Sequence, residues 1–258
     1  MKRFVRTIPL IIALIHLSAA GAAAQSSNGA EETLLPGEVP LTPGVVNLWG
    51  VQIFHRDTAF AVGDAGIIKK TEDGGNSWVT QFQAGGNNNI LLSVSYIDSA
   101  TATAVGWYGT ILRTTDAGET WVSQVSGTNE ALYAVSFVDP ATGTVVGDHG
   151  TIRRTTDGGA TWIKQDSGKA YPLLGLAFTG ALTGTAVGGG GKILHTTDGG
   201  TSWLSQTSGV PNFLYGVSFA DPNNGTAVGT LGTILHTTNG GSTWSSQSSG
   251  TLRYFYSV

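Results

Sequence analysis

An octapeptide that ends in tryptophan recurs five times along this chain at a nearly constant spacing. Each copy reads Thr-x-Asp-Gly-Gly-x-Ser/Thr-Trp, with Ala for the first Gly in the second copy and Asn for Asp in the fifth. The closing tryptophans lie 43, 41, 41 and 41 residues apart, and a Val-Gly pair ahead of each octapeptide keeps the same steps. A fixed period of this size indicates one supersecondary unit repeated, as in solenoids and propellers.

The third unit shows what is repeated. Alternating segments at 132–137, 144–147 and 151–156 are separated by turns rich in Asp, Gly and Pro, and a fourth segment at 162–165 follows the octapeptide. No stretch has the 3.6-residue period of a helix, so we predict four short antiparallel strands. Such a unit every 41 residues or so is typical of a propeller blade, and we expect an all-β chain that folds as a β-propeller of four-stranded antiparallel blades.

The repeat arithmetic also gives the domain organisation. Within a repeat domain at 45–258, five complete units are predicted at about 45–86, 87–127, 128–168, 169–209 and 210–250. Residues 249–258 align with 126–135 at an offset of 123, which is three times 41, so the chain stops inside the first strand of a sixth unit. We expect a C-terminally truncated propeller, because propellers close to avoid exposed sheet edges. The alternative is a closed five-bladed ring in which residues 251–258 pair with an existing blade.

The repeated carboxylate of the octapeptide is predicted to be structural. Asp can accept hydrogen bonds from its own turn, the second Gly takes a positive φ cheaply, and the Trp buries a large surface. Asn239 replaces Asp in the fifth copy, and five equivalent positions around a rim cannot converge on one substrate. We therefore interpret ten residues as determinants of the fold: Asp73, Trp78, Asp116, Trp121, Asp157, Trp162, Asp198, Trp203, Asn239 and Trp244.

The N-terminus is predicted to be an export signal. Basic residues precede an apolar run at 8–15, and Ala22, Ala23 and Ala24 offer a cleavage site, so residues 1–24 read as a signal peptide. Residues 25–44, with three of the eight prolines and no alternation, read as a linker. The apolar run is too short for a stable membrane span. We expect an exported protein, periplasmic or extracellular, with no membrane span after signal removal.

Charge and side-chain chemistry exclude several function classes. A net charge of -4 without a basic stripe argues against nucleic acid as a partner. The four histidines outside the signal have no metal-ligand spacing, so neither a metal nor a cofactor is predicted. A glycosidase needs two carboxyl groups within roughly 5–10 Å, whereas the best pair, Asp64 and Asp148, occupies equivalent turns two blades apart. No catalytic residue is predicted, and we do not expect an enzyme.

The combined pattern Val-Gly-x-x-Gly-Thr-Ile-Leu-x-Thr-Thr-Asp-Gly-Gly-x-Thr-Trp resembles the photosystem II stability/assembly factor family, in which the octapeptide is an Asp-box, or BNR repeat. The resemblance covers residues 45–258. It implies an exported, seven-bladed, non-catalytic scaffold for protein–protein interaction, with relatives in non-photosynthetic bacteria as well. Sialidases and related glycoside hydrolases carry the same boxes, so a carbohydrate-active propeller, either a glycan-binding module or a glycosidase-like protein, is the alternative.

Two sets of residues are candidate partner-binding sites, and the first is a basic column. One basic residue stands just before each Asp-box, at Lys70, Arg113, Arg154, His195 and His236. An exposed row of this kind would dock acidic segments of a partner protein, such as a membrane-associated or exported complex. The resemblance supports this, because the thylakoid factors use an arginine-rich surface. In the other interpretation, each cation pairs with the acidic turn of its own blade, a surface interaction worth ~0–1 kcal/mol.

The second candidate set lies in the turns between the second and third strands of the units. Trp107, Tyr108, Asp148 and His149 differ from one another there although the surrounding frame is constant. Loops between the units add variable residues at the same face: 87–89, Glu130, Tyr171, Phe213 and Arg253. Variation on a constant scaffold is how a repeat protein acquires specificity, and exposed aromatic side chains are typical interface anchors. The other interpretation is that Trp107 and Tyr108 only cover neighbouring blades.

Overall fold

The computed structural model describes residues 46–84, 89–168 and 170–258. The predicted signal peptide at 1–24 and linker at 25–44 lie outside these residues, as do Asn87, Asn88 and Lys169. Residues 48–258 form one compact unit, and only that unit is considered below.

The unit consists of short strands in five sheets of four, one sheet for each Asp-box. The blades are, in chain order, β1 (Leu48–His55), β2 (Thr58–Gly63), β3 (Ile68–Thr71) and β4 (Val79–Phe82); β5 (Leu91–Tyr96), β6 (Ala102–Gly106), β7 (Ile111–Thr114) and β8 (Val122–Gln124); β9 (Leu132–Phe137), β10 (Gly143–Gly147), β11 (Ile152–Thr155) and β12 (Ile163–Lys164); β13 (Leu173–Phe178), β14 (Gly184–Gly188), β15 (Ile193–Thr196) and β16 (Leu204–Gln206); β17 (Leu214–Phe219), β18 (Gly225–Gly229), β19 (Ile234–Thr237) and β20 (Ser245–Gln247). The prediction of five four-stranded antiparallel blades is confirmed.

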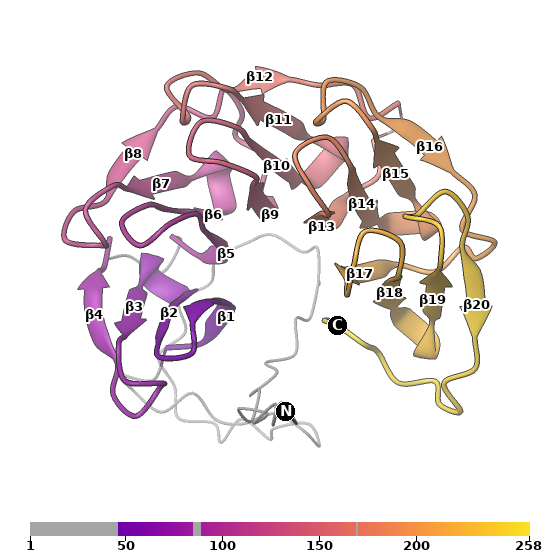
Figure 1. Ribbon diagram of the computed structural model, residues 1–258, viewed down its shortest axis with the longest axis horizontal. Helices are drawn as coiled ribbons and strands as arrows, with labels where there is room; N and C mark the ends of the chain where they lie inside the picture. The colour runs from indigo at the N-terminus through magenta and orange to yellow at the C-terminus, as the bar shows by residue number, and fades with distance from the viewer. Residues whose placement is uncertain (1–45, 85–88, 169) are drawn as a thin grey trace, which may run out of the picture. The chain divides into compact units, whose positions relative to one another are not determined.

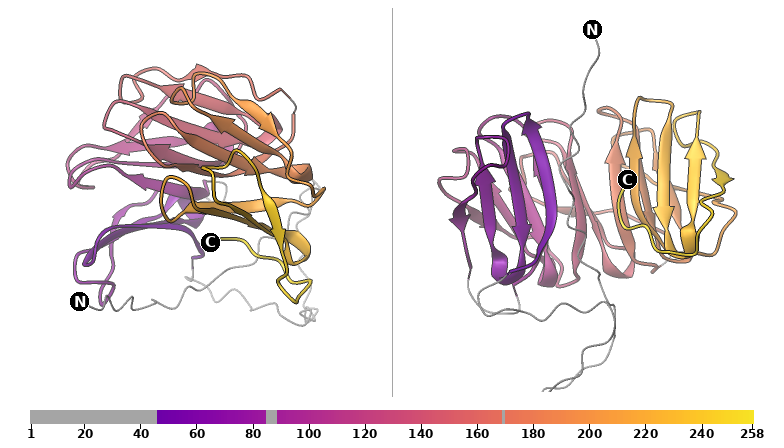
Figure 2. Two further views of the ribbon diagram at one scale, coloured as in Figure 1. Left: turned by 45° about the vertical axis from the view of Figure 1, so that its right-hand side comes forward. Right: turned by 90° about the horizontal axis from the view of Figure 1, so that it is seen from below.

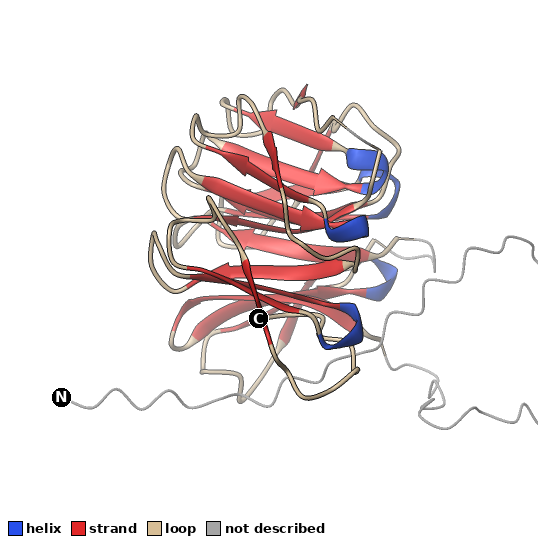
Figure 3. Cartoon of the chain, turned by 90° about the vertical axis from the view of Figure 1, so that its right-hand side faces the viewer, coloured by secondary structure: helices blue, strands red, loops and turns tan. Residues whose placement is uncertain are grey.

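A single turn of 3-10 helix joins the second and third strands of every blade. These turns are η1 (Asp64–Gly66), η2 (Trp107–Gly109), η3 (Asp148–Gly150), η4 (Gly189–Gly191) and η5 (Thr230–Gly232). The strands of all blades run between the same two ends of the unit (Figure 2). Because the 3-10 turns follow equivalent strands, all five lie at one end, as Figure 3 shows. The Asp-boxes join the third and fourth strands and therefore lie at the opposite end.

Blades pack on one another in series, with the first strand of each blade innermost (Figure 1). In the first interface, Phe60 and Val62 of the first blade form one buried cluster with Val94, Tyr96 and Trp121 of the second. The ring of Trp121 meets that of Phe60 edge-on, with 5.3 Å between centroids. Tryptophan therefore belongs to the core between blades, and the Asp-box that ends in it positions the interface.

The first blade presents the equivalent face to solvent. Val51 and Ile53 are 50% and 54% exposed, whereas Val94 and Tyr96, their counterparts one unit later, are 6% and 7% exposed. Trp78 is likewise more exposed than Trp121, Trp162 and Trp203. The sequence pattern is the same in these units, so the difference comes from what packs against each face.

Residues 251–258 lie against the fifth blade. The backbone N–H of Gly232 donates to the carbonyl of Arg253 at 2.7 Å, and that of Phe255 donates to the carbonyl of Gly229 at 3.0 Å. The rings of Tyr215 and Tyr256 are 5.0 Å apart. A first strand packs in this way on the preceding first strand, as β17 does on β13, so the segment takes the place that the alignment with 126–135 gives it. Continuation into a sixth blade stays a prediction.

Candidate functional site

The Asp-boxes bind their own backbone. Asp157 accepts the backbone N–H of Thr161 on Oδ1 at 2.9 Å and the Thr161 hydroxyl on Oδ2 at 2.6 Å. The buried Thr155 hydroxyl donates to Asp157 Oδ1 at 2.8 Å and accepts the Gly159 N–H at 2.8 Å. Hydrogen bonds from Thr161, first of all from its hydroxyl, lower the pKa of Asp157 to about 2. Both oxygens of the carboxylate therefore accept hydrogen bonds within their own hairpin.

The fifth box shows that the network does not need a charge. The amide oxygen of Asn239 accepts the Thr237 hydroxyl and the Thr243 N–H, both at 2.9 Å. Its amide nitrogen donates to the Thr243 hydroxyl at 2.8 Å. An amide reproduces the geometry of the carboxylate, as expected if the residue closes a turn rather than reacts with a substrate.

The basic column lies largely between blades. Arg113 is only 8% exposed. Its guanidinium donates to the Thr103 hydroxyl at 3.0 Å and to the Pro140 carbonyl at 2.6 Å, and it stands 4.8 Å above the ring of Phe137. Arg154 Nε donates to the Gly199 carbonyl at 2.7 Å. These two arginines therefore bind backbone carbonyls and an aromatic ring of the following blade, which neither interpretation of the sequence anticipated.

The remaining members of the column do not form an exposed row either. His195 is buried, and burial lowers its pKa. Lys70, whose side chain is 12% exposed, pairs with Glu72 of its own blade at 2.6 Å, as the second interpretation expects. His236 in the fifth blade is partly exposed. The geometry leaves little of this column for a docked partner.

The 3-10 turn end displays its side chains differently. The middle residue of each turn has a left-handed backbone, and in three of the five turns it is a large side chain: Tyr108 at φ 56°, His149 at φ 50° and Leu231 at φ 55°. The equivalent residues in the other two turns are Ala65 and Gly190. A bulky residue with positive φ costs conformational energy that glycine avoids, and such strain concentrates at functional sites. The chain therefore accepts strain where it holds these side chains in solvent.

Exposed aromatic residues lie in and beside these turns. Trp107 and Tyr108 are 39% and 59% exposed, and their rings meet edge-on with 6.3 Å between centroids. Tyr171 and Phe213, in the loops between blades, are exposed as well. An open cleft of about 420 Å³ separates Tyr108 and Thr110 from the loop that contains Ser126 and Asn129. Trp107 and Tyr108 are thus more accessible than residues that merely cover a blade.

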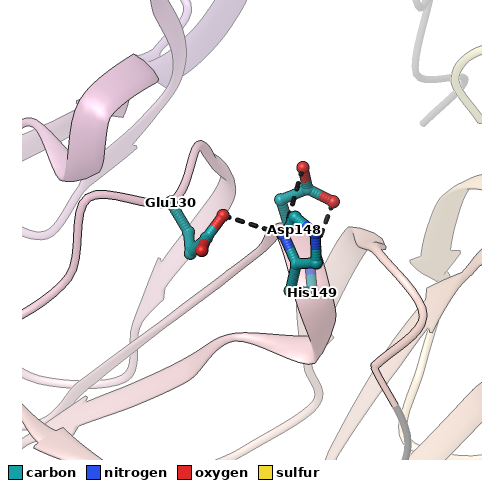
Figure 4. Close-up of side chains that lie close together, drawn as sticks. All are labelled: Glu130, Asp148 and His149. Carbon is teal, nitrogen blue, oxygen red and sulfur yellow. Dashed lines mark hydrogen bonds and ion pairs between the residues drawn. The ribbon is translucent and has the colours of Figure 1, made fainter. Parts of the chain in front are cut away.

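Three polar side chains meet at the third blade (Figure 4). His149 Nδ1 lies 2.8 Å from Glu130 Oε2 and 3.6 Å from Asp148 Oδ2. The His149 pKa is raised, first by the hydrogen bond to Glu130 and then by the negative charges of Asp148 and Glu130. Half-buried Tyr133 also has a raised pKa, first through burial and then through the same two carboxylates. Two carboxylates and one imidazole give this group a net negative charge even when His149 is protonated.

The same three residues are metal-donor types. Within the described ranges, they are the group of His and carboxylate side chains whose ligand atoms all lie within 4.8 Å of one another. Sequence spacing did not indicate this group, because Glu130 is 19 residues from His149. The repeat supplied a different signal, because the second candidate set places Glu130, in the loop that leads into the third blade, at the same face as the turn that carries Asp148 and His149.

Comparisons with known proteins agree with a propeller of this kind. The family model of the photosynthesis system II assembly factor YCF48 matches residues 123–208. The predicted resemblance is confirmed. The matched segment runs from the end of the second blade into the loop after the fourth, and therefore includes Glu130, Asp148 and His149. No curated protein matches the chain.

Solved structures share the fold at low identity. "YCF48 bound to D1 peptide" is 18% identical, with a TM-score of 0.56 over 80% of this chain and 83% of that one. YCF48 from Cyanidioschyzon merolae is 16% identical, with a TM-score of 0.54 over 80% and 86%. The GH74 enzyme of Niastella koreensis is 18% identical, with a TM-score of 0.60, but 79% of this chain covers only 38% of that one. These likenesses establish the propeller fold alone.

Among the described residues, no helix has the length and apolar character that a membrane crossing requires.

Proposed function

We propose that this chain is an exported, non-catalytic β-propeller that binds a protein partner at the 3-10 turn end of its blades. The observation that carries the proposal is the display of Tyr108, His149 and Leu231 at one strained backbone position, where Ala65 and Gly190 show that a small residue suffices. Side chains that vary at a fixed position on a rigid frame are suited to recognition.

Similarity to a related complex supports a protein partner. One structure with the same fold is that of YCF48 with a D1 peptide bound, and the matching family consists of assembly factors. Exposed Trp107 and Tyr108 provide large, rigid contact surfaces of the kind that anchors interfaces. We favour this end over the basic column, because Arg113 and His195 are buried between blades.

Site-specific cross-linking tests the location. A photoreactive phenylalanine analogue at Tyr108 should capture a partner in the native cell, whereas the same analogue at Glu119, an exposed Asp-box residue of the same blade, should not. Loss of the cross-link on Trp107→Ala, in a chain whose circular dichroism shows that the blades remain folded, would support the aromatic anchor. Equal capture from both positions would contradict the proposed site.

A glycoside assay tests the non-catalytic part of the proposal. The GH74 likeness keeps a carbohydrate-active function in view, although this chain spans only about two fifths of the Niastella koreensis enzyme. We expect no release of chromophore from aryl glycosides and no saturable binding to a glycan array. Hydrolysis that survives repeated purification would overturn the proposal in favour of a carbohydrate-active propeller.

Export can be examined separately. Fusing residues 1–44 to alkaline phosphatase, which is active only outside the bacterial cytoplasm, should give an active reporter. Replacing the apolar run at 8–15 by polar residues should abolish that activity. An inactive fusion would remove export from the proposal without affecting the binding site.

A further inference from the structure

Two equivalent clefts on the 3-10 turn end differ in the charge beside them. The first lies between η2 and the loop that leads into the third blade, and the second lies between η5 and residues 249–252, with volumes of about 420 and 540 Å³. Most of their lining residues correspond at the repeat offset of 123, so that Tyr108 matches Leu231 and Thr110 matches Thr233, and the second cleft is lined by Val210 and Asn212 as well. The molecule thus contains two recesses built on the same part of the repeat.

A shared backbone arrangement builds both recesses. Ser126 donates its hydroxyl to the Thr128 carbonyl at 3.0 Å, and Ser249 does the same to the Thr251 carbonyl at 3.0 Å. A left-handed residue of the 3-10 turn, Tyr108 or Leu231, forms the opposite wall. The side chains around this shared frame differ between the two recesses, and Asn212, which donates to the Thr233 hydroxyl, lines only the second.

The residue that follows each cleft reverses the charge. Asn129 lines the end of the first cleft and is followed by Glu130, whereas Leu252 lines the end of the second and is followed by Arg253. Glu130 lies beside Asp148 and His149, and the guanidinium of Arg153 donates to the carbonyl of Gly127 on the wall of the cleft. Two carboxylates accept more hydrogen bonds than one imidazole N–H supplies, so the group retains acceptors for a cationic donor.

The walls of the first cleft add apolar surface. Tyr108 and Val125 are 59% and 86% exposed, and both line the cleft. Tyrosine can also attract a cation over its ring. An extended segment with an apolar side chain next to a basic one fits this combination of surfaces.

We propose that the cleft between η2 and residues 123–130 binds an extended peptide segment, with a lysine or arginine side chain at Glu130 and Asp148 and an apolar side chain between Tyr108 and Val125. The inference rests on the proposed function and deepens it by naming the chemistry of the partner. It replaces the acidic segment expected from the basic column with a basic one. The second cleft, beside Arg253, supplies the matched control.

Two labelled peptides test the proposal on the full chain. Fluorescence anisotropy with Gly-Leu-Lys-Leu-Lys-Gly and Gly-Leu-Glu-Leu-Glu-Gly should show preferential binding of the basic peptide. Glu130→Arg, which gives the first cleft the charge of the second, should weaken the basic peptide about tenfold, because an attraction becomes a repulsion. Tyr108→Ala should weaken it by a smaller factor, and added salt should weaken it further.

The control variant changes the other cleft. Arg253→Gln should leave the affinity for the basic peptide unchanged, because that residue follows the second recess. Circular dichroism of each variant checks that the blades remain folded, which is expected because the side chains of Glu130 and Arg253 lie outside the buried clusters.

Several outcomes overturn the proposal. It is wrong if neither peptide binds, if the acidic peptide binds better, or if Glu130→Arg leaves the basic peptide unaffected. It is also wrong if ZnCl2 alone, titrated by calorimetry, binds stoichiometrically and abolishes peptide binding to the wild-type chain, because the group would then be a metal site. A Tyr108 cross-link that persists despite these results would leave the proposed function intact and remove only the basic-segment preference.

Discussion

The two ends of the blades use the same repeat in opposite ways. At the Asp-box end, Asp73, Asp116, Asp157 and Asp198 make one hydrogen-bond network four times, and Asn239 reproduces it without a charge. At the 3-10 turn end, the backbone is equally constant, but its middle residue changes from Ala65 to Tyr108 to His149. At the Asp-box end the side chains are the same in every blade, because they hold the fold together. At the 3-10 turn end only the backbone is the same, so the side chains there can differ from blade to blade.

Two tryptophans give the largest expected contrast. Trp162 at the Asp-box end is 7% exposed, meets Phe137 edge-on and donates to Gln124 at 3.2 Å. Trp162→Ala should lower the free energy of unfolding by about 3–5 kcal/mol, as expected for a buried aromatic side chain. Trp107→Ala should cost about 1–2 kcal/mol, because 39% of that residue is already exposed.

Urea denaturation measures both values under one condition. Equal destabilisation by Trp107→Ala and Trp162→Ala would contradict the assignment of a structural role to the Asp-box end alone. Impaired capture of the partner by Trp107→Ala only would support a binding role for the 3-10 turn end.

A smaller effect is expected from one hydroxyl of the Asp-box. Thr155 is 1% exposed, and its hydroxyl accepts the Gly159 N–H and donates to Asp157. Thr155→Val keeps the shape but leaves the buried N–H without an acceptor, which should cost about 1–3 kcal/mol. Thr201→Val is the control, because the Thr201 hydroxyl is exposed and donates only to the Asp198 carbonyl at 3.0 Å. Equal unfolding midpoints for the two variants would contradict the network.

Local patterns account for what the sequence predicted well. The Asp-box bonds join residues two to four positions apart, so the octapeptide contains both partners of each bond. The strand predicted at 132–137 is β9 itself, and the strand predicted at 151–156 contains β11 (Ile152–Thr155). Strands and turns are recognised from residues a few positions apart, and the repeat then gives the same strands and turns in every other unit.

Long-range contacts account for what the sequence did not predict. Arg113 bonds the Pro140 carbonyl 27 residues away, and Arg154 bonds the Gly199 carbonyl 45 residues away. Both contacts depend on how one blade packs on the next, which no single repeat contains. The sequence showed that a basic residue precedes each Asp-box. That these residues are buried between blades could be seen only from the packing of the blades.

Acid should reduce the stability that the Asp-boxes contribute. Hydrogen bonds from Ser or Thr hydroxyls hold the pKa of Asp73, Asp116, Asp157 and Asp198 at about 2, below the ordinary 3.8. Because the folded pKa is the lower one, the stabilisation is complete above pH 3.8 and is lost as the pH falls toward 2. Unfolding midpoints in urea should therefore decrease between pH 4 and pH 2.5, as about 0.4–0.8 proton per box is taken up on unfolding.

Asn239 suggests the variant that isolates this effect. Asp157→Asn should retain the hairpin, as the fifth box does, while removing one titrating group, so the decrease in stability on acidification should become shallower. An unchanged pH dependence in this variant would show that carboxylates other than the boxes govern the acid response.

The smallest expected effect concerns the 3-10 turn end and should be visible in a pKa alone. The His149 pKa is raised chiefly because Glu130 accepts the Nδ1–H at 2.8 Å, and Asp148 adds to it. Glu130→Gln removes the leading cause, so the His149 pKa, followed through its ring protons by NMR, should fall toward its ordinary value but stay above it because Asp148 remains. His195 is the internal control, since its pKa is lowered by burial between blades and Glu130 is not among the causes. The melting temperature should not change, because the pair is exposed. A decrease in stability together with a change in the His195 pKa would mean that Glu130 supports the packing of blades. Glu130 would then have a structural role, contrary to the role assigned to the 3-10 turn end.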